Sequence, residues 1–299
     1  MLSKNAAAVE IKETAKDRFI RTTNAEIFCR FIGKGMPLIV LHGGPGLSHD
    51  YLLPQLYKLA ENNFVIFYDQ RGSGRTTGEI NSSTITIETF VSDVNTIRHA
   101  FNLKKVSILG HSWGGFLAMQ YAIAHPEHIE KLILSNSMPA SSEEYALFSQ
   151  EWTRRMAPYQ NELEAIHQSP EFAEGDSALI EKMYRIIFKT YCFNPNSVNS
   201  LNLYMSPIAS MNGARVYEHF CLNIFDKSFN LHESLTSLQI PTLVLHGDDD
   251  PIPPITAQKI HESIENSEFV LMKDCGHFPF VEDQDIYFKL LEKFLSKDR

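Results

Sequence analysis

Short apolar runs alternate with longer amphipathic stretches along most of this 299-residue chain. The short runs are apolar on both faces and lie at 37–41, 64–68, 106–109, 132–134 and 242–245. Runs of this kind are typical of strands in a parallel sheet that helices cover on both sides. Apolar residues three and four positions apart, as in 87–101 and 116–125, predict those helices. The pattern therefore predicts an α/β fold with a mostly parallel, doubly wound sheet.

The two ends of the alternating pattern add antiparallel strands and a final helix. Arg18–Thr22 and Glu26–Phe31 read as two strands joined by the turn residues Thr23 and Asn24, which predicts an N-terminal hairpin. The amphipathic stretch 285–295 predicts a helix that packs its apolar face on the sheet.

Between about 137 and 235 the alternation stops. This segment has a helical pattern, and Pro158, Pro170, Pro195 and Pro207 divide it into pieces. We expect a helical cap domain at 137–235, inserted into an α/β-hydrolase core domain formed by 1–136 and 236–299.

Composition and charge narrow the class of protein. The chain is 43% apolar and 21% charged, as in ordinary globular proteins, and its net charge is −9. This acidity argues against nucleic acid or an anionic membrane surface as a partner. No run approaches the ~20 apolar residues of a membrane-spanning helix, and the N-terminus lacks the apolar core of a secretory signal. We therefore expect a cytoplasmic protein; its oligomeric state stays open.

Four cysteines without a C-x-x-C pair predict free thiols and no structural zinc; they are Cys29, Cys192, Cys221 and Cys275.

The first chemical motif is G-x-S-x-G, formed by residues 110–114 at the end of a predicted strand. In this motif the serine occupies a sharp strand-to-helix turn, with glycines where side chains would collide. Five residues alone are a weak signal, because small residues gather at many such turns for packing reasons. The flanking strand and helix strengthen it, so Ser112 is the candidate nucleophile.

A serine hydroxyl needs a base, and the base needs a group that fixes its tautomer. Asp250 and His277 each follow a predicted strand, so the chain order is serine, aspartate, histidine, as in α/β-hydrolases. Considered alone, an aspartate before a proline usually caps a helix or forms a turn, and a single histidine usually has a structural role. Asp250 fits a G-x-x-D-x-x-x-P spacing to Pro254, with Asp248 as the alternative.

The reaction also needs donors to the oxyanion. His42-Gly43-Gly44-Pro45-Gly46 follows the third predicted strand, and we assign one donor to the N–H of Gly44 and the other to the N–H of Trp113. The alternative is a plain glycine turn. We expect Asp69 and Arg71 to support this loop, with Asp69 bonded to Arg71 or to backbone.

Three segments together resemble a family: HGGPG at 42–46, DQRGSGR at 69–75 and GHSWGG at 110–115. They are similar to the proline iminopeptidases and the tricorn-interacting aminopeptidase, which are α/β-hydrolases. The resemblance implies release of an N-terminal residue, often proline, from a short peptide, arylamide or amide, without metal or organic cofactor. The chain departs from the family pattern at His111, where glycine is frequent, and at Asp249, where an aromatic residue is frequent.

In that family, cap glutamates hold the α-ammonium group of the substrate. Glu218 resembles the position of one such glutamate, although an exposed helix residue is an equal reading. Glu143 and Glu144 are weaker candidates, and only Glu151-Trp152 resembles the tryptophan-rich cap helix. Phe278, with Phe280, would wall a pocket for a proline ring, or belong to the core.

The segment 143–181 contains nine acidic residues and only two arginines. This acidic surplus would attract the cationic N-terminus of a peptide.

We therefore expect a serine aminopeptidase acting on small peptides, with a carboxylesterase or lactonase acting on small esters or amides as the alternative on the same scaffold. A pocket without a carboxylate would favour the esterase. An epoxide hydrolase would need an aspartate in place of Ser112. The presence of all three triad residue types argues against a non-catalytic binding protein.

Overall fold

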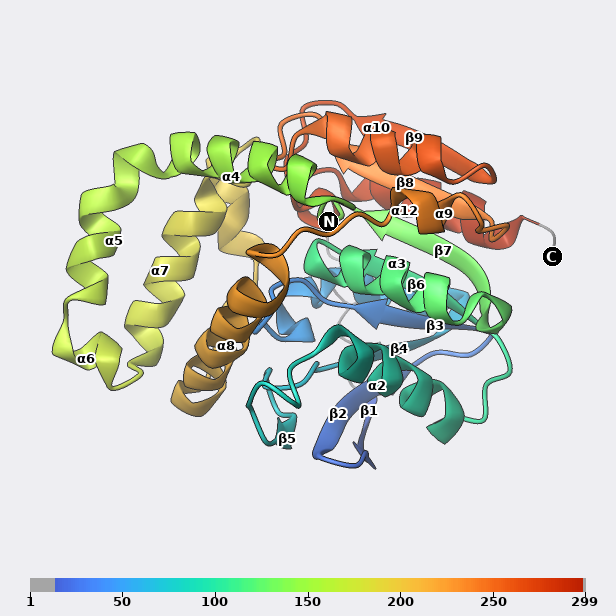
Figure 1. The fold of residues 1–299 in the computed structure, drawn as a ribbon, viewed down its shortest axis with the longest axis horizontal. Helices are drawn as coiled ribbons and strands as arrows, with labels where there is room; N and C mark the ends of the chain where they lie inside the picture. Colours follow the sequence, from blue (N-terminus) through green and yellow to red (C-terminus); the bar gives the residue numbers. More distant parts are fainter. Residues whose placement is uncertain (1–13, 298–299) are drawn as a thin grey trace.

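The computed structural model describes residues 14–297, so the first 13 residues of the expected core domain lie outside the described part. Its centre is a nine-stranded sheet in the order β1-β2-β4-β3-β6-β7-β8-β9, with β5 paired to β2 (Figure 1). The strands are β1 (Lys16–Arg21), β2 (Ala25–Ile32), β3 (Met36–Leu41), β4 (Asn63–Tyr68), β5 (Thr77–Gly78), β6 (Val106–His111), β7 (Ile129–Ser135), β8 (Thr242–Gly247) and β9 (Ser267–Met272).

The sheet is parallel from β4 to β9 and antiparallel at its N-terminal edge, where β1 pairs with β2 and β2 pairs with β4. Both predictions are confirmed: the antiparallel hairpin, and the parallel strands that are apolar on both faces. The strand β5 was not expected, since Thr77 and Gly78 carry no apolar pattern.

Successive residues of one strand enter different cores, which is what buries both faces of the sheet. Ile39 and Leu41 pack into the core beneath α2 (Ile87–Ala100) and α3 (Trp113–Ala124). Leu38 and Val40 pack into the opposite core, which α12 (Gln284–Ser296) covers.

The connection from β3 to β4 differs from a regular crossover helix. It consists of two 3₁₀ helices, His49–Leu52 and Gln55–Glu61, with Pro54 between them. Proline removes a backbone donor and interrupts a continuous helix.

The chain between β7 and β8 is helical, apart from short connections, and Figure 1 shows α4 to α8 beyond one end of the sheet. Three prolines expected to divide this region, Pro170, Pro195 and Pro207, stand in the first turn of a helix, where no backbone donor is missed. The helices are α4 (Ser142–Met156), α5 (Gln160–His167), α6 (Pro170–Ala173), α7 (Ser177–Lys189), α8 (Pro207–Phe220) and α9 (His232–Leu235).

After β8 the alternation resumes with α10 (Pro254–Ser263), and α11 (Pro279–Glu282) precedes the final helix. We propose that 137–235 forms a cap domain, consistent with its place between β7 and β8.

One arginine ties α4 to the loop after β8. The Arg155 guanidinium donates to the carbonyl of Thr190, at 3.1 Å, and to the carbonyl and carboxylate of Asp249, at 2.9 and 3.0 Å. Its neighbour Arg154 is exposed and pairs only with Glu151 in the described structure. Arg155 therefore fastens α4 to the segment that carries Asp250.

Arg155→Ala should lower the free energy of unfolding by about 2 kcal/mol, because it removes charge-assisted hydrogen bonds at a partly buried position. Arg154→Ala on the same helix is the matched control and should leave stability nearly unchanged, since exposed ion pairs contribute little. Urea unfolding of both variants measures the difference. Equal loss in both would contradict the anchoring role.

Candidate functional site

Ser112 lies at the turn between β6 and α3, in a backbone conformation that side chains rarely adopt. Its φ is 57° and its ψ is −123°. A Cβ at Gly114 would lie 2.1 Å from the carbonyl oxygen of Leu41, and one at Gly110 would lie 2.3 Å from that of Gly114. The two glycines of the motif are thus sterically required, and the tight turn presents Ser112 half-buried above the sheet.

Asp250 and His277 are in direct contact at the carboxyl ends of β8 and β9. Asp250 Oδ2 lies 2.8 Å from His277 Nδ1 and accepts a second hydrogen bond, of 2.7 Å, from the Asn136 side chain. Its Oδ1 accepts from the N–H of Ile252 at 2.8 Å. Burial alone would raise the pKa of Asp250, but His277, His246 and Asn136 lower it below its ordinary value.

The neighbouring aspartates have other partners. Asp248 pairs with Lys273, at 3.3 Å, and Asp249 pairs with Arg155. Among the three consecutive carboxylates, the structure brings Asp250 to His277.

Asn136 was missed by the sequence reasoning. It follows β7 with φ of 48°, and its side chain joins Asp250 to the carbonyl of Gly276 at 3.0 Å. A polar residue directly after a buried strand, in the stretch 135–137, was the available signal.

The glycine loop after β3 is held by Gln70. The Gln70 side chain donates to the carbonyl of His42 at 2.7 Å and accepts from the indole N–H of Trp113 at 2.8 Å. The N–H of Gln70 donates to His42 Nε2 at 3.0 Å, and burial lowers the pKa of His42 to about 4, so the ring is a neutral acceptor. Gly44 has φ of 124°, in the region that favours glycine, and lines the same cavity as Ser112.

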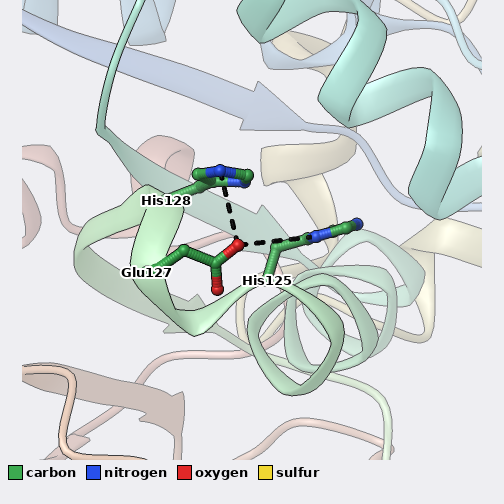
Figure 2. A group of neighbouring side chains, drawn as sticks. All are labelled: His125, Glu127 and His128. Atoms are coloured by element: carbon green, nitrogen blue, oxygen red, sulfur yellow. Dashed lines mark ion pairs between the residues drawn. The ribbon is translucent and has the colours of Figure 1, made fainter.

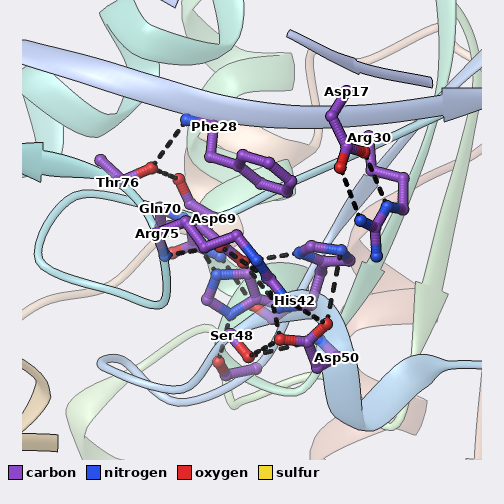
Figure 3. A network of polar contacts seen from close by, with 12 residues as sticks. Asp17, Phe28, Arg30, His42, Ser48, Asp50, Asp69, Gln70, Arg75 and Thr76 are labelled. Atoms are coloured by element: carbon purple, nitrogen blue, oxygen red, sulfur yellow. Dashed lines mark hydrogen bonds and ion pairs between the residues drawn. The ribbon is translucent and has the colours of Figure 1, made fainter. Parts of the chain in front are cut away.

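Asp69 and Arg71 support this region, but not through each other; Figure 3 shows the polar network around Asp69, which includes Arg75 and Asp50. Asp69 Oδ1 lies 2.6 Å from His49 Nδ1, and its Oδ2 accepts from the N–H of Arg75 at 2.8 Å. Arg71 instead forms a buried pair with Asp93 on α2, at 2.6 and 2.9 Å. Of the two expected bonds of Asp69, the one to Arg71 is not formed, because Arg71 pairs with Asp93, 22 residues further along the chain. The expected bond of Asp69 to backbone is present.

A cavity of about 580 Å³ lies over Ser112, between the sheet and helices α4, α7 and α8. Its walls are mainly aromatic and aliphatic, and Ser112, His277, Gly44 and Phe278 all line it. Phe280, by contrast, is fully buried and does not line it. Within residues 14–297, no aspartate or glutamate lines this cavity.

Glu218 does not reach the cavity. On α8 the lining residues are Gly213, Ala214 and Tyr217, whereas Glu218 is exposed. Because 3.6 residues complete a helical turn, a residue two positions from the buried Val216 points away from the core. The expectation that Glu218 lies near Ser112 is therefore not met.

The other acidic candidates have partners outside the cavity. Glu144 is buried and contacts His232 at 2.9 Å and Lys259 at 3.4 Å, while Glu151 pairs with Arg154 and Arg155. Trp152, next to Glu151, does line the cavity. Glu143 is exposed on the first turn of α4.

One group of side chains has the composition of a metal site: His125, Glu127 and His128, between α3 and β7 (Figure 2). Glu127 lies 3.3 Å from His128 Nε2 and 3.9 Å from His125 Nδ1. The Arg98 guanidinium approaches the same His128 nitrogen to 3.4 Å. A cation there would meet this fixed positive charge, so the group is a poor metal site.

The fold and the turn at Ser112 define a class. A family model described as alpha/beta hydrolase fold matches residues 36–284. The chain belongs to this family and is a hydrolase. Among the described residues, no helix is both long and apolar enough to cross a bilayer.

Within the family, the chain belongs with the proline iminopeptidases. It is 33% identical over 274 residues to the proline iminopeptidase of Lactobacillus acidophilus, with 87% of this chain and 90% of the relative covered. The crystal structure of proline iminopeptidase from Mycobacterium smegmatis shares the fold, with a TM-score of 0.71 and 23% identity over 94% of this chain and 97% of that one. Esterase RhEst1 from Rhodococcus also shares the fold, with a TM-score of 0.69 and 21% identity, over 95% of this chain and 99% of the esterase.

Asp69→Asn should destabilise the protein by about 2 kcal/mol at pH 7, because a buried carboxylate with hydrogen-bonded partners loses its charge. Burial alone would raise the pKa of Asp69, but contacts with His49 and Arg75 lower it well below its ordinary range. A depressed carboxyl pKa gives stability that is present above the unfolded value and lost as pH falls.

The stability difference between wild type and Asp69→Asn should therefore shrink below about pH 4. Asp50→Asn, which alters another carboxylate bound to Arg75 but only partly buried, is the control and should cost less. Urea unfolding at pH 7 and pH 3.5 measures both. A pH-independent difference would rule out the charged form of Asp69 as the stabilising group.

Proposed function

We propose that the protein is a serine hydrolase that works through an acyl-enzyme on Ser112. The observation that carries the proposal is the 2.8 Å contact between Asp250 and His277, because His277 also lines the cavity that Ser112 lines. With Nδ1 engaged by Asp250, the ring leaves Nε2 to act as a base toward the serine.

The proposed reaction has two halves. His277 Nε2 takes the Ser112 proton as the hydroxyl oxygen attacks the substrate carbonyl, and the N–H groups of Gly44 and Trp113 donate to the resulting oxyanion. Collapse of this intermediate breaks the bond to the leaving group, which takes the proton from His277. Water then attacks the acyl-enzyme with His277 again as base, releasing the acid and restoring Ser112. No step requires a metal or an organic cofactor.

The first candidate substrate is a short peptide whose N-terminal proline, or another N-terminal residue, becomes the acyl group. The names of the relatives support this candidate. The apolar cavity wall that includes Phe278 also suits a proline ring.

The second candidate is an ester or lactone with an apolar, uncharged acyl group, cleaved by a carboxylesterase or lactonase. The cavity favours it, because no carboxylate among residues 14–297 lines the wall to receive an ammonium group. Burying a cation without a partner raises the free energy by several kcal/mol or more. Contact of the cation with an aromatic face lowers it by only about 0.5–2 kcal/mol. On geometry alone, the uncharged acyl group is the better fit.

The triad roles can be tested with neighbouring aspartates. Asp250→Asn should lower kcat by about three to four orders of magnitude, because the amide no longer fixes the ring tautomer of His277. Asp248→Asn, two residues earlier, is the matched control and should stay near wild type. Ser112→Ala should abolish turnover while the circular dichroism spectrum is unchanged. Full activity of Ser112→Ala would overturn the proposal.

The substrate class can be tested with two naphthylamides of equal ring size. In one the acyl group is prolyl, with its charged ammonium group. In the other it is cyclopentanecarbonyl, which carries no charge. The cavity predicts that kcat/KM favours the uncharged compound by about tenfold or more. The p-nitrophenyl ester of cyclopentanecarboxylic acid serves as the positive control for acyl transfer. A tenfold preference for the prolyl compound would instead establish the aminopeptidase.

A further inference from the structure

We propose that Tyr51 and His111 form a positioning relay that fixes the oxyanion loop and the base His277 relative to each other. Neither residue is assigned a role in the reaction above. The inference rests on the proposed function, since it concerns how the same acyl-transfer site is held together.

The relay is a chain of three short hydrogen bonds. The N–H of Gly43 donates to the Tyr51 hydroxyl at 2.6 Å, and the Tyr51 hydroxyl lies 2.7 Å from His111 Nδ1. His111 Nε2 lies 2.8 Å from the carbonyl oxygen of His277. The chain thus joins the loop after β3, the last residue of β6 and the loop after β9.

The direction of every bond in the chain follows from its two ends. A backbone N–H can only donate, so the Tyr51 oxygen accepts from Gly43 and gives its own proton to His111 Nδ1. A carbonyl can only accept, so His111 must carry its proton on Nε2. One neutral tautomer of His111 satisfies both contacts, and burial together with His277 lowers the pKa of His111 to about 3.

At the oxyanion end, the relay holds the glycine loop next to Ser112. A Cβ at Gly43 would lie 2.7 Å from the Tyr51 hydroxyl and 2.9 Å from the Ser112 Cβ, so the backbone of Gly43 sits between the two side chains. Because Tyr51 engages the N–H of Gly43, the next N–H, that of Gly44, is the one left to serve the oxyanion.

At the other end, both backbone groups of His277 are engaged. Its carbonyl is held by His111, and its N–H donates to the carbonyl of Tyr191 at 2.7 Å. The two histidine rings lie 4.8 Å apart, so a shift of His111 would disturb the base directly.

Tyr51 and His111 line the cavity over Ser112, but each is at most 2% exposed. The rings of Phe278 and Phe280 pack against both. A lost hydrogen bond here leaves a buried polar group without a partner.

Tyr51→Phe tests the relay, with the cyclopentanecarboxylic and prolyl naphthylamides and the matching p-nitrophenyl ester as substrates. We expect kcat to fall about tenfold on whichever substrate wild type cleaves, with KM changed less than about twofold, because the altered contacts serve the oxyanion and the base. The control is Tyr287→Phe, which removes a buried hydroxyl bonded to Ser135 at 3.2 Å and should leave kcat near wild type.

A second readout separates positioning from a general loss of packing. Replacing the ester carbonyl oxygen by sulfur weakens the hydrogen bonds of an oxyanion site, so wild type should strongly prefer the carbonyl ester over the thiono ester. In Tyr51→Phe this preference should decrease by about tenfold. An unchanged preference, or an unchanged kcat, in a folded variant would overturn the relay.

Two substitutions of His111 cover the case in which Tyr51→Phe fails to fold. His111→Asn keeps a polar atom for the tyrosine, and His111→Gln keeps a donor for the carbonyl of His277. A continuous relay predicts that each lowers kcat about tenfold, and wild-type kcat in both would contradict it. Turnover by Ser112→Ala would instead show that the proposed function itself is wrong, whatever the relay variants do.

Discussion

The site depends on one constraint: polar groups lie buried at the carboxyl end of an apolar sheet, where each needs a hydrogen-bond partner. His42, Asp69, His111 and Asp250 are all at most 2% exposed. An unpaired polar group at such depth costs more than a paired one contributes. Each loop is therefore fixed by contacts to other loops, and the geometry around Ser112 results from mutual satisfaction of these groups.

This constraint explains why the loops carry so many ring and amide side chains. Gln70 joins the carbonyl of His42 to the indole of Trp113, and Asn136 joins Asp250 to the carbonyl of Gly276. Gln70 does so with one donor and one acceptor, whereas Asn136 donates both bonds from its NH₂ group, so one amide side chain can serve two segments. Backbone groups alone, fixed by the strands, would not span these gaps.

The sequence predicted what depends on local pattern and missed what depends on distant contacts. The parallel strands and the nucleophile turn were predicted because apolar runs and glycine spacing are local constraints. His111 lies 60 residues from Tyr51 and 166 from His277, so no spacing in the chain reveals their contact. Glu218 was proposed from a resemblance in position, with an exposed helix residue as the equal alternative, and the burial of Gly213, Val216 and Phe220 shows the helical phase that leaves it exposed.

The acidic surplus of the chain and the composition of its cavity favour different substrates: the surplus attracts a cation, whereas the cavity suits an uncharged group. Some acidic side chains of the cap helices pair with arginine or lysine on the helix surfaces, as Glu162 does with Lys182 and Glu181 with Arg185. Charges at such exposed positions are screened within about 10 Å at ordinary salt and steer an approaching cation only weakly. Within the cavity over Ser112 the wall is mainly aromatic and aliphatic, and no aspartate or glutamate of residues 14–297 lines it. We therefore propose that the cavity selects against a charged acyl group through the cost of desolvating it, a larger effect than surface attraction can offset.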